Sequence, residues 1–451
     1  MTLSRKITQA ARGVTMDNLT PEVVSKVKIG LLDMLSCAFE SRHLPWGEQA
    51  IRMVSRAPGG KSTVIGTPLR VAAGEAAFAN ATLGHGLVRE DMHAGAVSHL
   101  GVVIFPTLLA LAQDRLVSGR DFILGAVCGY EIGASVGRAI MDRDVVRRFR
   151  PTGITGPLGG AAAGSRMLGL GEEQTISAIG LAANMTGGLN EWPYCGGDEM
   201  FFHPGFAARS AVTAVELAEL GAFASETALD GRSGLFAGLG KGAAVDAVRP
   251  FSGQPAEILS VYYKPAPACN YAQTACQAAL SLARQERVQP GEIASVTVKA
   301  SAAAAGYPGC DFTGPFERIL QAKMSIQYCV AATLVRGVLE EANYHLLDDP
   351  EVTRLAGITR LEEDPIFTQA YPRAQGSEVI VSLRNGETLA RRMPDLIPAS
   401  PEEIRERFRT AAAKALGPEV AGSIEGMIDV LDQQADVGTL SALLNCCTNQ
   451  K

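Results

Sequence analysis

The feature that most constrains the fold of this chain is a change in its hydrophobic pattern near residue 267. Upstream, apolar residues recur at the three- and four-residue spacing of helices, as in segment 24–35. Downstream, segments 293–299 and 377–383 alternate apolar with polar residues and are rich in β-branched side chains, which is the pattern of strands. The sequence therefore predicts a mainly α fold in which a large all-helical unit is followed by a smaller α+β unit.

The helical pattern returns near the C-terminus. The segment Ser400-Pro401-Glu402 supplies, in order, a helix N-cap, a proline at the first helical position and an acid in the first turn. We expect this tail to rejoin the first unit, so that residues 1–266 and 397–451 form the helical domain and residues 267–396 the α+β domain. A chain of 451 residues is long enough for more than one core.

Several individual elements can also be predicted. Asn385-Gly386 is a strong hairpin signal, so strand 377–383 is expected to turn back into a strand at 388–393. Two glycine-containing segments, 59–62 and 238–242, fail the P-loop and dinucleotide patterns, and we interpret them as turns. Helices are expected at residues 156–168 (rich in Gly and Ala, hence buried), 173–185, 205–220, 272–283 and 325–341.

Composition excludes several classes of function. The chain is 47% hydrophobic and 20% charged with a net charge of -6, and no basic tract suggests nucleic acid. Charged residues, Gly or Pro interrupt every apolar run of membrane-spanning length, and the N-terminus lacks the apolar core of a signal peptide. We therefore expect a cytoplasmic protein that binds neither nucleic acid nor membrane.

The cysteines predict neither disulfides nor a metal centre. There are nine of them, they form no Cys-x-x-Cys pair, and the one close pair is Cys446-Cys447. An odd, scattered set indicates reduced thiols and argues against zinc or an iron–sulfur cluster. We expect Cys128, Cys276 and Cys329 to be buried, because each lies in an apolar helical segment.

The strongest candidate for a site is the segment 84–99. It lies between two Ala-rich or apolar segments, 74–83 and 102–111, that are expected to be buried helices. A polar loop carried by packed helices is a common way to build a site, although histidines at such places can equally cap helices or satisfy buried carbonyls. The segment holds three of the six histidines together with nearby charged residues: His85, Arg89, Glu90, Asp91, His93 and His99.

A second candidate is Lys264, at the expected junction of the two domains. Pro265 and Pro267 fix the backbone that follows it. In an interdomain cleft such a lysine can have a lowered pKa and act as a base, or it can stay charged and bind a carboxylate. The alternative is a surface lysine beside a rigid linker.

Five segments together resemble the MmgE/PrpD family. Their order and spacing match across nearly the whole chain. They are residues 85–106, Phe149-Arg150-Pro151-Thr152-Gly153, His203-Pro204-Gly205-Phe206-Ala207-Ala208-Arg209-Ser210, residues 264–271 and Ala322-Lys323-Met324-Ser325-Ile326-Gln327-Tyr328.

This resemblance implies a helical domain built from both chain ends, an α+β lid domain and a homodimer. The family contains 2-methylcitrate dehydratase, cis-aconitate decarboxylase and iminodisuccinate epimerase, so it also implies a small polycarboxylate substrate bound between the domains, without metal or organic cofactor. His99 and Lys264 stand at the positions of the family's catalytic histidine and lysine.

The chain also departs from the family pattern at several polar positions. A dehydratase must protonate a leaving hydroxyl as well as remove a proton, so the loss of donors argues against elimination. The replacements are Val88 for Asp, Met92 for Thr, Arg150 for His, Met200 for Lys, Asn270 for Arg and Gln273 for His.

From these departures we favour an epimerase or racemase of an amino- or imino-linked dicarboxylate of the iminodisuccinate type. Epimerisation needs two proton carriers and cations that hold the carboxylates. A 2-methylcitrate-type dehydratase and a non-catalytic polycarboxylate-binding protein remain the alternatives. We expect His99 and Lys264 to be the proton carriers, with Tyr194 and Tyr271 as reserve candidates for the second carrier. Asp91 or His93 is expected to orient the carriers. The residues expected to bind the carboxylates are Arg89, Arg150, Lys323 and Gln327.

Overall fold

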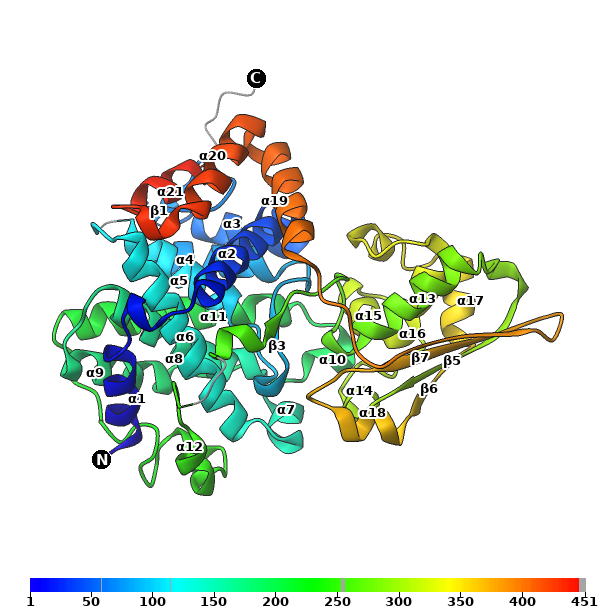
Figure 1. Cartoon of the computed structure of the whole chain (residues 1–451), viewed down its shortest axis with the longest axis horizontal. Helices are drawn as coiled ribbons and strands as arrows, with labels where there is room; N and C mark the ends of the chain where they lie inside the picture. The colour runs from blue at the N-terminus through cyan, green and yellow to red at the C-terminus, as the bar shows by residue number, and fades with distance from the viewer. Residues whose placement is uncertain (58, 114, 253–255, 446–451) are drawn as a thin grey trace.

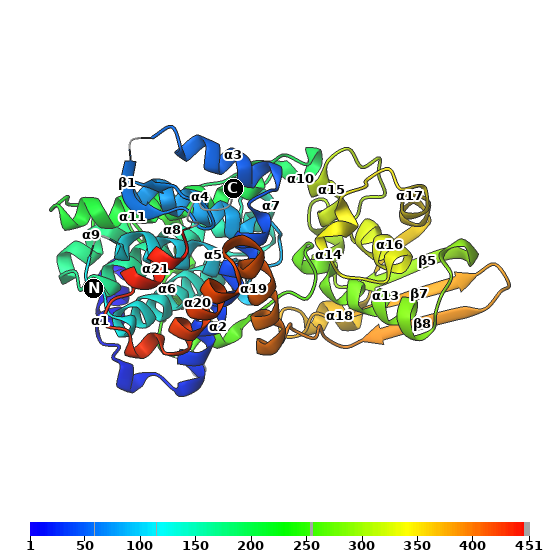
Figure 2. The same ribbon diagram turned by 90° about the horizontal axis from the view of Figure 1, so that it is seen from above.

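The computed structural model describes residues 1–57, 59–113, 115–252 and 256–445, so Cys446 and Cys447 lie outside the described residues. Two bodies lie side by side: a large helical one that contains both chain ends, and a smaller one built on a sheet (Figures 1 and 2).

The helical body is built around a buried pair of helices, α5 and α6. Most of its helices come from the first half of the chain, and three come from its end. They are α1 (Leu3–Arg12), α2 (Pro21–Ser41), α3 (Pro45–Val54), α4 (Ala73–His85), α5 (Gly101–Ala112), α6 (Gly119–Ile140), α7 (Arg143–Arg148), α8 (Pro151–Met167), α9 (Glu172–Asn184), α10 (Trp192–Cys195), α11 (Glu199–Glu219), α12 (Leu235–Gly238), α19 (Pro401–Leu416), α20 (Pro418–Asp429) and α21 (Gly438–Leu443).

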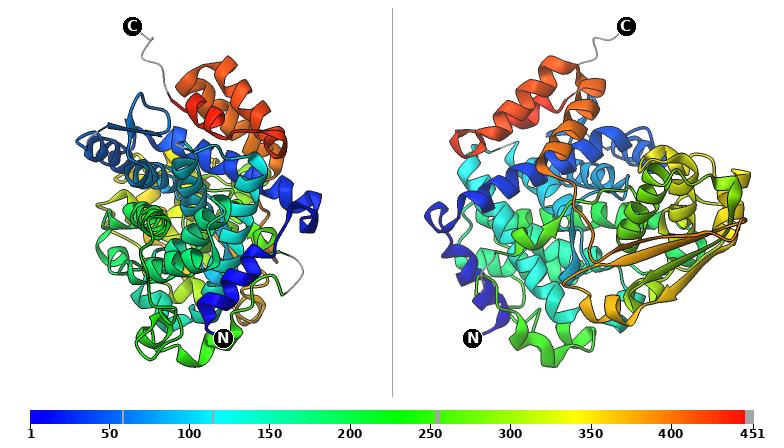
Figure 3. Two further views of the ribbon diagram at one scale, coloured as in Figure 1. Left: turned by 90° about the vertical axis from the view of Figure 1, so that its left-hand side faces the viewer. Right: turned by 45° about the vertical axis from the view of Figure 1, so that its right-hand side comes forward.

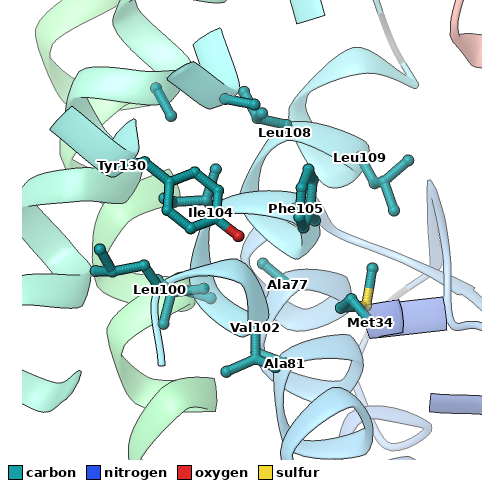
Figure 4. Packing of buried hydrophobic residues seen from close by; sticks show 14 of the residues in the cluster. Met34, Ala77, Ala81, Leu100, Val102, Ile104, Phe105, Leu108, Leu109 and Tyr130 are labelled. Carbon is teal, nitrogen blue, oxygen red and sulfur yellow. The ribbon is translucent and has the colours of Figure 1, made fainter. Parts of the chain in front are cut away.

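Every residue of α5 is buried, because α2, α4, α6, α8 and α11 pack against it. Figure 4 shows part of this packing. Phe105 lies near its middle, with the Tyr130 ring of α6 at a centroid distance of 6.1 Å. The glycines of α8 allow close packing: a Cβ on Gly160 would come within 2.6 Å of the Ala211 side chain of α11. The small residues from which the sequence predicted a buried helix are thus needed for the close contact between α8 and its neighbouring helices.

The end of the chain returns to the helical body. Helix α19 packs along α2, and the Phe39 and Phe408 rings lie 6.3 Å apart between them (Figure 3). One hydrophobic core accordingly contains residues from both ends of the chain, and a second core lies in the smaller body.

The smaller body holds a four-stranded mixed sheet. Its strands are β5 (Ile293–Ala300), β6 (Thr359–Glu363), β7 (Ser377–Leu383) and β8 (Thr388–Met393), in the order β6-β5-β7-β8. Strand β5 pairs with β6 in parallel and with β7 antiparallel, and β7 pairs antiparallel with β8. The helices of this body are α13 (Gln273–Gln285), α14 (Ala302–Gly306), α15 (Ile319–Met324), α16 (Ile326–Arg336), α17 (Pro350–Gly357) and α18 (Pro365–Ala370).

The predicted mainly α fold with an α+β part is confirmed, and so is the 377–393 hairpin. Strand β6 was not predicted, because its sequence is polar and its side chains are mostly exposed. The helix expected at 325–341 ends at Arg336, since Gly337 adopts a φ of 65° that stops it. Helix α11 begins at Glu199, before the predicted residue 205, and has Pro204 inside it.

Segment 59–62, which we interpreted as a turn, is a strand. Strand β1 (Gly59–Thr63) pairs antiparallel with β2 (Arg70–Val71). A Cβ on Gly60 would come within 2.4 Å of the Val71 backbone, so glycine is needed here for the two backbones to approach closely. Because glycine has no side chain, this strand lacks the alternation of apolar and polar residues that would have predicted it.

Helix α6 is long and apolar enough to cross a membrane by length and composition, contrary to our expectation that every such run is interrupted. However, 89% of its apolar window is buried inside the protein. Its composition is explained by its place in the core.

Replacing Phe105 by Ala tests the central position of α5. Phe105 is fully buried, so we expect Phe105→Ala to lower the free energy of unfolding by about 3–5 kcal/mol in denaturant titrations followed by circular dichroism. The matched control is Leu116→Ala, since Leu116 is 87% exposed and its loss should change stability by less than about 0.5 kcal/mol. Equal effects of the two substitutions would contradict this packing.

Candidate active site

A short pair of strands brings the two candidate segments together. After α4 ends at His85, the chain forms β3 (Met92–His93), which pairs antiparallel with β4 (Val261–Tyr262). Because Lys264 comes two residues after the end of β4, this strand pair brings it to the histidine-containing loop. Residues far apart in the sequence therefore meet at the junction of the two bodies.

One carboxylate oxygen, Oε1 of Glu90, is the centre of this cluster. It lies 2.7 Å from Nδ1 of His85, 3.0 Å from Nδ1 of His99 and 3.8 Å from Nζ of Lys264. Glu90, His85 and Lys264 are fully buried, and His99 is only 4% exposed. A buried carboxylate needs such partners, and here all of them are candidate proton carriers.

The electrostatics of the cluster follow from burial and from Glu90. Burial would raise the pKa of the Glu90 carboxyl, but Lys264 and then the two imidazoles outweigh it and hold that pKa well below its ordinary value. Burial lowers the pKa of Lys264, with Glu90 opposing the shift. Burial also lowers the pKa of His85, and it lowers that of His99 well below the ordinary value, so both rings are neutral near pH 7.

The hydrogen bonds of His99 assign its tautomer. Nδ1 lies 2.8 Å from the main-chain oxygen of Asp91, in addition to its contact with Glu90. Because both neighbours are acceptors, Nδ1 carries the proton and donates it. The lone pair is then on Nε2, which leaves a neutral ring whose Nε2 can take or return a proton at the cavity that His99 lines.

The cavity at His99 is small and mostly apolar. Its volume is about 30 Å³, room for roughly two water molecules. It is lined by His99, Arg150, Asn270 and Cys269 together with Val88, Met92, Val97, Trp192, Met200, Tyr271, Tyr307 and Met324.

An outer cavity of about 250 Å³ adjoins it, and Val97, Tyr271 and Tyr307 line both. Arg143 and Arg147 lie at the outer cavity. The shared residues thus form the wall between the two spaces. A volume of about 30 Å³ is too small for a polycarboxylate, so side chains that line the inner cavity must move for one to bind at His99.

Arg150 is placed to bind a carboxylate in the inner cavity. Its Nη2 lies 3.2 Å from Nε2 of His85, and its guanidinium lies over the Trp192 ring at 5.6 Å. The buried Nε of Arg150 and the indole Nε1 of Trp192 have no hydrogen-bond partner. Buried donors without an acceptor are costly, and a planar guanidinium suits the two oxygens of a carboxylate.

Two residues of the cavity wall have strained backbones. Val88 and Val97 have φ values of 59° and 50°. This left-handed region is unfavourable for β-branched residues, and such strain gathers at functional sites because the surrounding structure enforces it. At residue 88 the family has Asp, a residue that tolerates this conformation better.

The structure brings four of the sequence-predicted residues to this place. His99, Arg150 and Tyr271 line the inner cavity. Lys264 lies behind His99, against Glu90, and does not line the cavity. Its Nζ also donates to the Ala268 carbonyl at 3.4 Å.

Asp91 is adjacent to the cavity but is engaged in structure. Its carboxylate accepts from Tyr130 Oη at 2.6 Å and from the Gly101 amide at 3.2 Å, at the start of α5. Burial raises the pKa of Asp91 to about 6. Its main-chain oxygen orients His99, so the residue contributes through its backbone.

The other predicted residues lie outside the cavity. His93 contacts Glu257 at 2.9 Å, and Arg89 donates to Glu40 at 2.8 Å. Lys323 donates to the Leu87 carbonyl at 2.8 Å and to Glu341 at 2.5 Å. Gln327 accepts from the Phe312 amide, and Tyr194 is 64% exposed on α10.

Sequence reasoning did not select Glu90 or His85 as site residues. Both lie in segment 84–99, and the signal was an acid five residues after a histidine at a helix end. That spacing fits no regular helix or strand face, so only the loop geometry shows that the two side chains meet. Among the residues that the structure describes, no group of three or more His, Cys, Asp or Glu side chains is placed to hold a metal ion.

The chain belongs to the MmgE/PrpD family. Residues 5–247 match the MmgE/PrpD N-terminal domain, and residues 266–433 match the MmgE/PrpD C-terminal domain. The resemblance found in the sequence motifs is thereby confirmed over both halves of the chain.

Known relatives of the chain are lyases by name. The cis-aconitate decarboxylase-like protein oryM of Aspergillus oryzae (strain ATCC 42149 / RIB 40) is 29% identical, over 95% of this chain and 94% of the relative. Cis-aconitate decarboxylase of Homo sapiens is 27% identical, over 98% of this chain and 94% of the relative. The 2-methylcitrate dehydratase-like protein oryR of Aspergillus oryzae is 29% identical over 45% of this chain and 43% of its own length.

The central place of Glu90 can be tested against its neighbour. We expect Glu90→Gln to lower kcat by about 10²–10⁴-fold, because His99 and Lys264 lose the charge that orients them. Asp91→Asn is the matched control. Its amide oxygen can still accept from Tyr130, and the backbone oxygen that orients His99 remains, so we expect a smaller loss. If Asp91→Asn lowered kcat more than Glu90→Gln, the central carboxylate would be Asp91, and the role given to Glu90 would be wrong.

The pH dependence of the free enzyme tests the state of His99. Burial lowers the pKa of this imidazole, so the ring stays neutral as the pH falls through 6.5. We therefore expect NMR titration of the free protein to show a neutral His99 imidazole as the pH falls through 6.5. A titration midpoint at or above pH 6.5 would show that His99 is not held neutral by its surroundings.

Proposed function

We propose that this protein is a lyase that decarboxylates a small di- or tricarboxylate, with His99 as the proton carrier and Arg150 as the carboxylate receptor. The observation that carries the proposal is the pair of groups at the inner cavity: a neutral imidazole with its Nε2 available, and a buried guanidinium whose Nε has no acceptor. The relatives that align with nearly the whole chain are named for decarboxylation, which supports the same reaction class.

In this mechanism a carboxylate of the substrate binds Arg150. The bond to a second carboxyl group breaks and carbon dioxide leaves, while the electron pair delocalises toward the carboxylate that Arg150 holds. A carbon that shares this electron pair must then receive a proton: the one that lost the carboxyl group or, where a double bond shifts, the one at its far end. His99 supplies this proton from Nε2.

The proton reaches His99 when the substrate binds. The bound anion raises the pKa of the imidazole, so Nε2 takes up a proton. Glu90 stabilises the resulting imidazolium through Nδ1, as a carboxylate does in other histidine-based sites.

Dehydration is supported less well. It requires an acid for the leaving hydroxyl. At three positions where the family carries polar groups, the inner cavity has the side chains of Val88, Met92 and Met200. These apolar side chains favour a substrate with an apolar substituent and no hydroxyl on that side.

Epimerisation, which the sequence favoured, is the second candidate. It needs no leaving-group acid, which fits the apolar wall. However, it requires two proton carriers that face the same carbon, and Lys264 contacts Glu90 without lining the cavity. Tyr271 lines the cavity, but burial raises the pKa of its phenol well above the ordinary value, so the phenol stays protonated near pH 7 and does not accept a proton.

Proton NMR in D2O separates these reactions. The full-length protein is incubated with saturated and unsaturated di- and tricarboxylates, including cis-aconitate, 2-methylcitrate and iminodisuccinate. We expect the protein to release carbon dioxide and to place one deuterium on the carbon that receives the proton. We expect His99→Gln to slow both the release of carbon dioxide and the incorporation of deuterium by about 10²–10⁴-fold.

Other outcomes contradict the proposal in distinct ways. A new alkene without carbon dioxide would indicate dehydration. Exchange of the proton next to a carboxylate, with conversion between isomers, would indicate epimerisation. Saturable binding without any reaction would indicate a binding protein.

A further inference from the structure

A third cavity, of about 360 Å³, lies between α2 and α19 and is also lined by Arg89, the residue before Glu90. The two helices run close together where the end of the chain packs back on its beginning (Figure 3). We infer that this cavity binds a small multivalent oxyanion, a phosphate or a polycarboxylate, separately from the catalytic cavity.

The first argument is charge. Among the described residues that line the cavity, Arg42, Arg89, Arg407 and Lys414 are basic, and Glu40 and Glu406 are acidic. The remaining titratable group is His43, whose pKa is lowered by burial and then by Arg42, so it is neutral near pH 7. The cavity therefore carries an excess of positive charge, which attracts anions.

The second argument is the state of Arg89. This residue is only 8% exposed, and its Nε has no hydrogen-bond partner. Its one carboxylate, Glu40, bonds to Nη2 at 2.8 Å and has a side chain that is 38% exposed. A buried guanidinium with an unused donor at the wall of a cavity is a receptor for a further oxygen ligand.

The third argument is the closeness of two guanidinium groups. The pKa of Arg407 is lowered, first by burial and then by the charge of Arg89. Both arginines line this cavity, although, against the effect of burial, Cys37, Glu40 and Asp33 raise the pKa of Arg89. A multivalent anion placed between two guanidinium groups is attracted by both.

The size of the cavity restricts the ligand. A volume of about 360 Å³ fits a small molecule and is near the lower end of ordinary ligand sites. Exposed Lys414 of α19 adds a fourth cationic side chain to the lining of the cavity. A compact ion with several oxygens meets these donors at once, whereas a nucleic acid or a peptide does not fit.

The position of this cavity couples it to the catalytic cluster. Arg89 directly precedes Glu90. Arg407 donates to the main-chain oxygens of Lys264 at 3.0 Å and of Pro265 at 3.1 Å. An anion on Arg89 and Arg407 therefore acts on the backbone that holds both Glu90 and Lys264.

Binding is tested by calorimetry with the full-length protein at constant ionic strength. The probes are inorganic phosphate and, separately, tricarballylate, a tricarboxylate with neither a double bond nor a hydroxyl. We expect saturable binding of at least one probe that weakens about tenfold or more in Lys414→Glu, because the reversed charge repels the ion. Lys414→Arg keeps the charge and should keep the affinity.

Arg391→Glu is the matched control, since Arg391 is exposed on β8, in the other body. It makes the same change in net charge and should leave the affinity unchanged. The inference is overturned if neither probe binds saturably, or if Lys414→Glu and Arg391→Glu have the same effect on both. If Lys414→Glu weakens the binding of phosphate alone, the ligand is a phosphate. If it weakens the binding of tricarballylate alone, the ligand is a polycarboxylate. Either result supports the site.

Hydrogen exchange locates the bound ion without any activity measurement. We expect the probe to slow exchange in the peptide covering residues 264–272, and this protection to disappear in Lys414→Glu. Protection that persists in Lys414→Glu would place the ion in the catalytic cavity and overturn the inference.

Discussion

The structure depends on one buried carboxylate at the junction of the two bodies. Glu90 Oε1 is shared by His85, His99 and Lys264. Buried charges are stable only when they are paired, and breaking such a pair is strongly destabilising. The same pairing fixes which nitrogen of His99 carries its proton, so the stability of the cluster and its chemistry have one cause.

This constraint explains the arrangement of the surrounding elements. The short β3–β4 pair is too small to contribute much stability, yet it sets Lys264 beside the loop that carries Glu90. Arg407, from the end of the chain, fixes the Lys264 backbone from behind. Helices from both ends of the chain and the α+β body thus meet at one cluster, which is a preferred place for a ligand site.

The spacing of apolar residues was sufficient to predict the helical part, the α+β part and the strands of the hairpin at 377–393. A helix or strand that buries one face must repeat its apolar residues at the period of that element. It did not predict β6, whose exposed side chains carry no such pattern. The motifs selected His99 and Arg150, which the structure brings to one cavity. They did not show that Arg89, His93 and Lys323 turn away from the cavity, since the direction of a loop side chain depends on contacts with residues distant in the sequence.

Glu90 is a residue whose role the sequence could not show. Adjacent acids, Glu90 and Asp91, look equivalent in the sequence, and we selected Asp91. The structure separates them: one is ionised among three basic groups, and the other, with a pKa raised to about 6, binds Tyr130 and the start of α5. Environment, and not residue type, assigns their roles.

The most direct test of this account is a crystal structure with an unreactive tricarboxylate bound. We predict one carboxylate of the ligand on Arg150, at its Nε, and a carbon of the ligand within about 3–3.5 Å of His99 Nε2. The Tyr271 and Tyr307 wall should have moved to admit it. A ligand whose carboxylates bind away from Arg150, or a His99 whose Nε2 faces away from the ligand, would contradict the account.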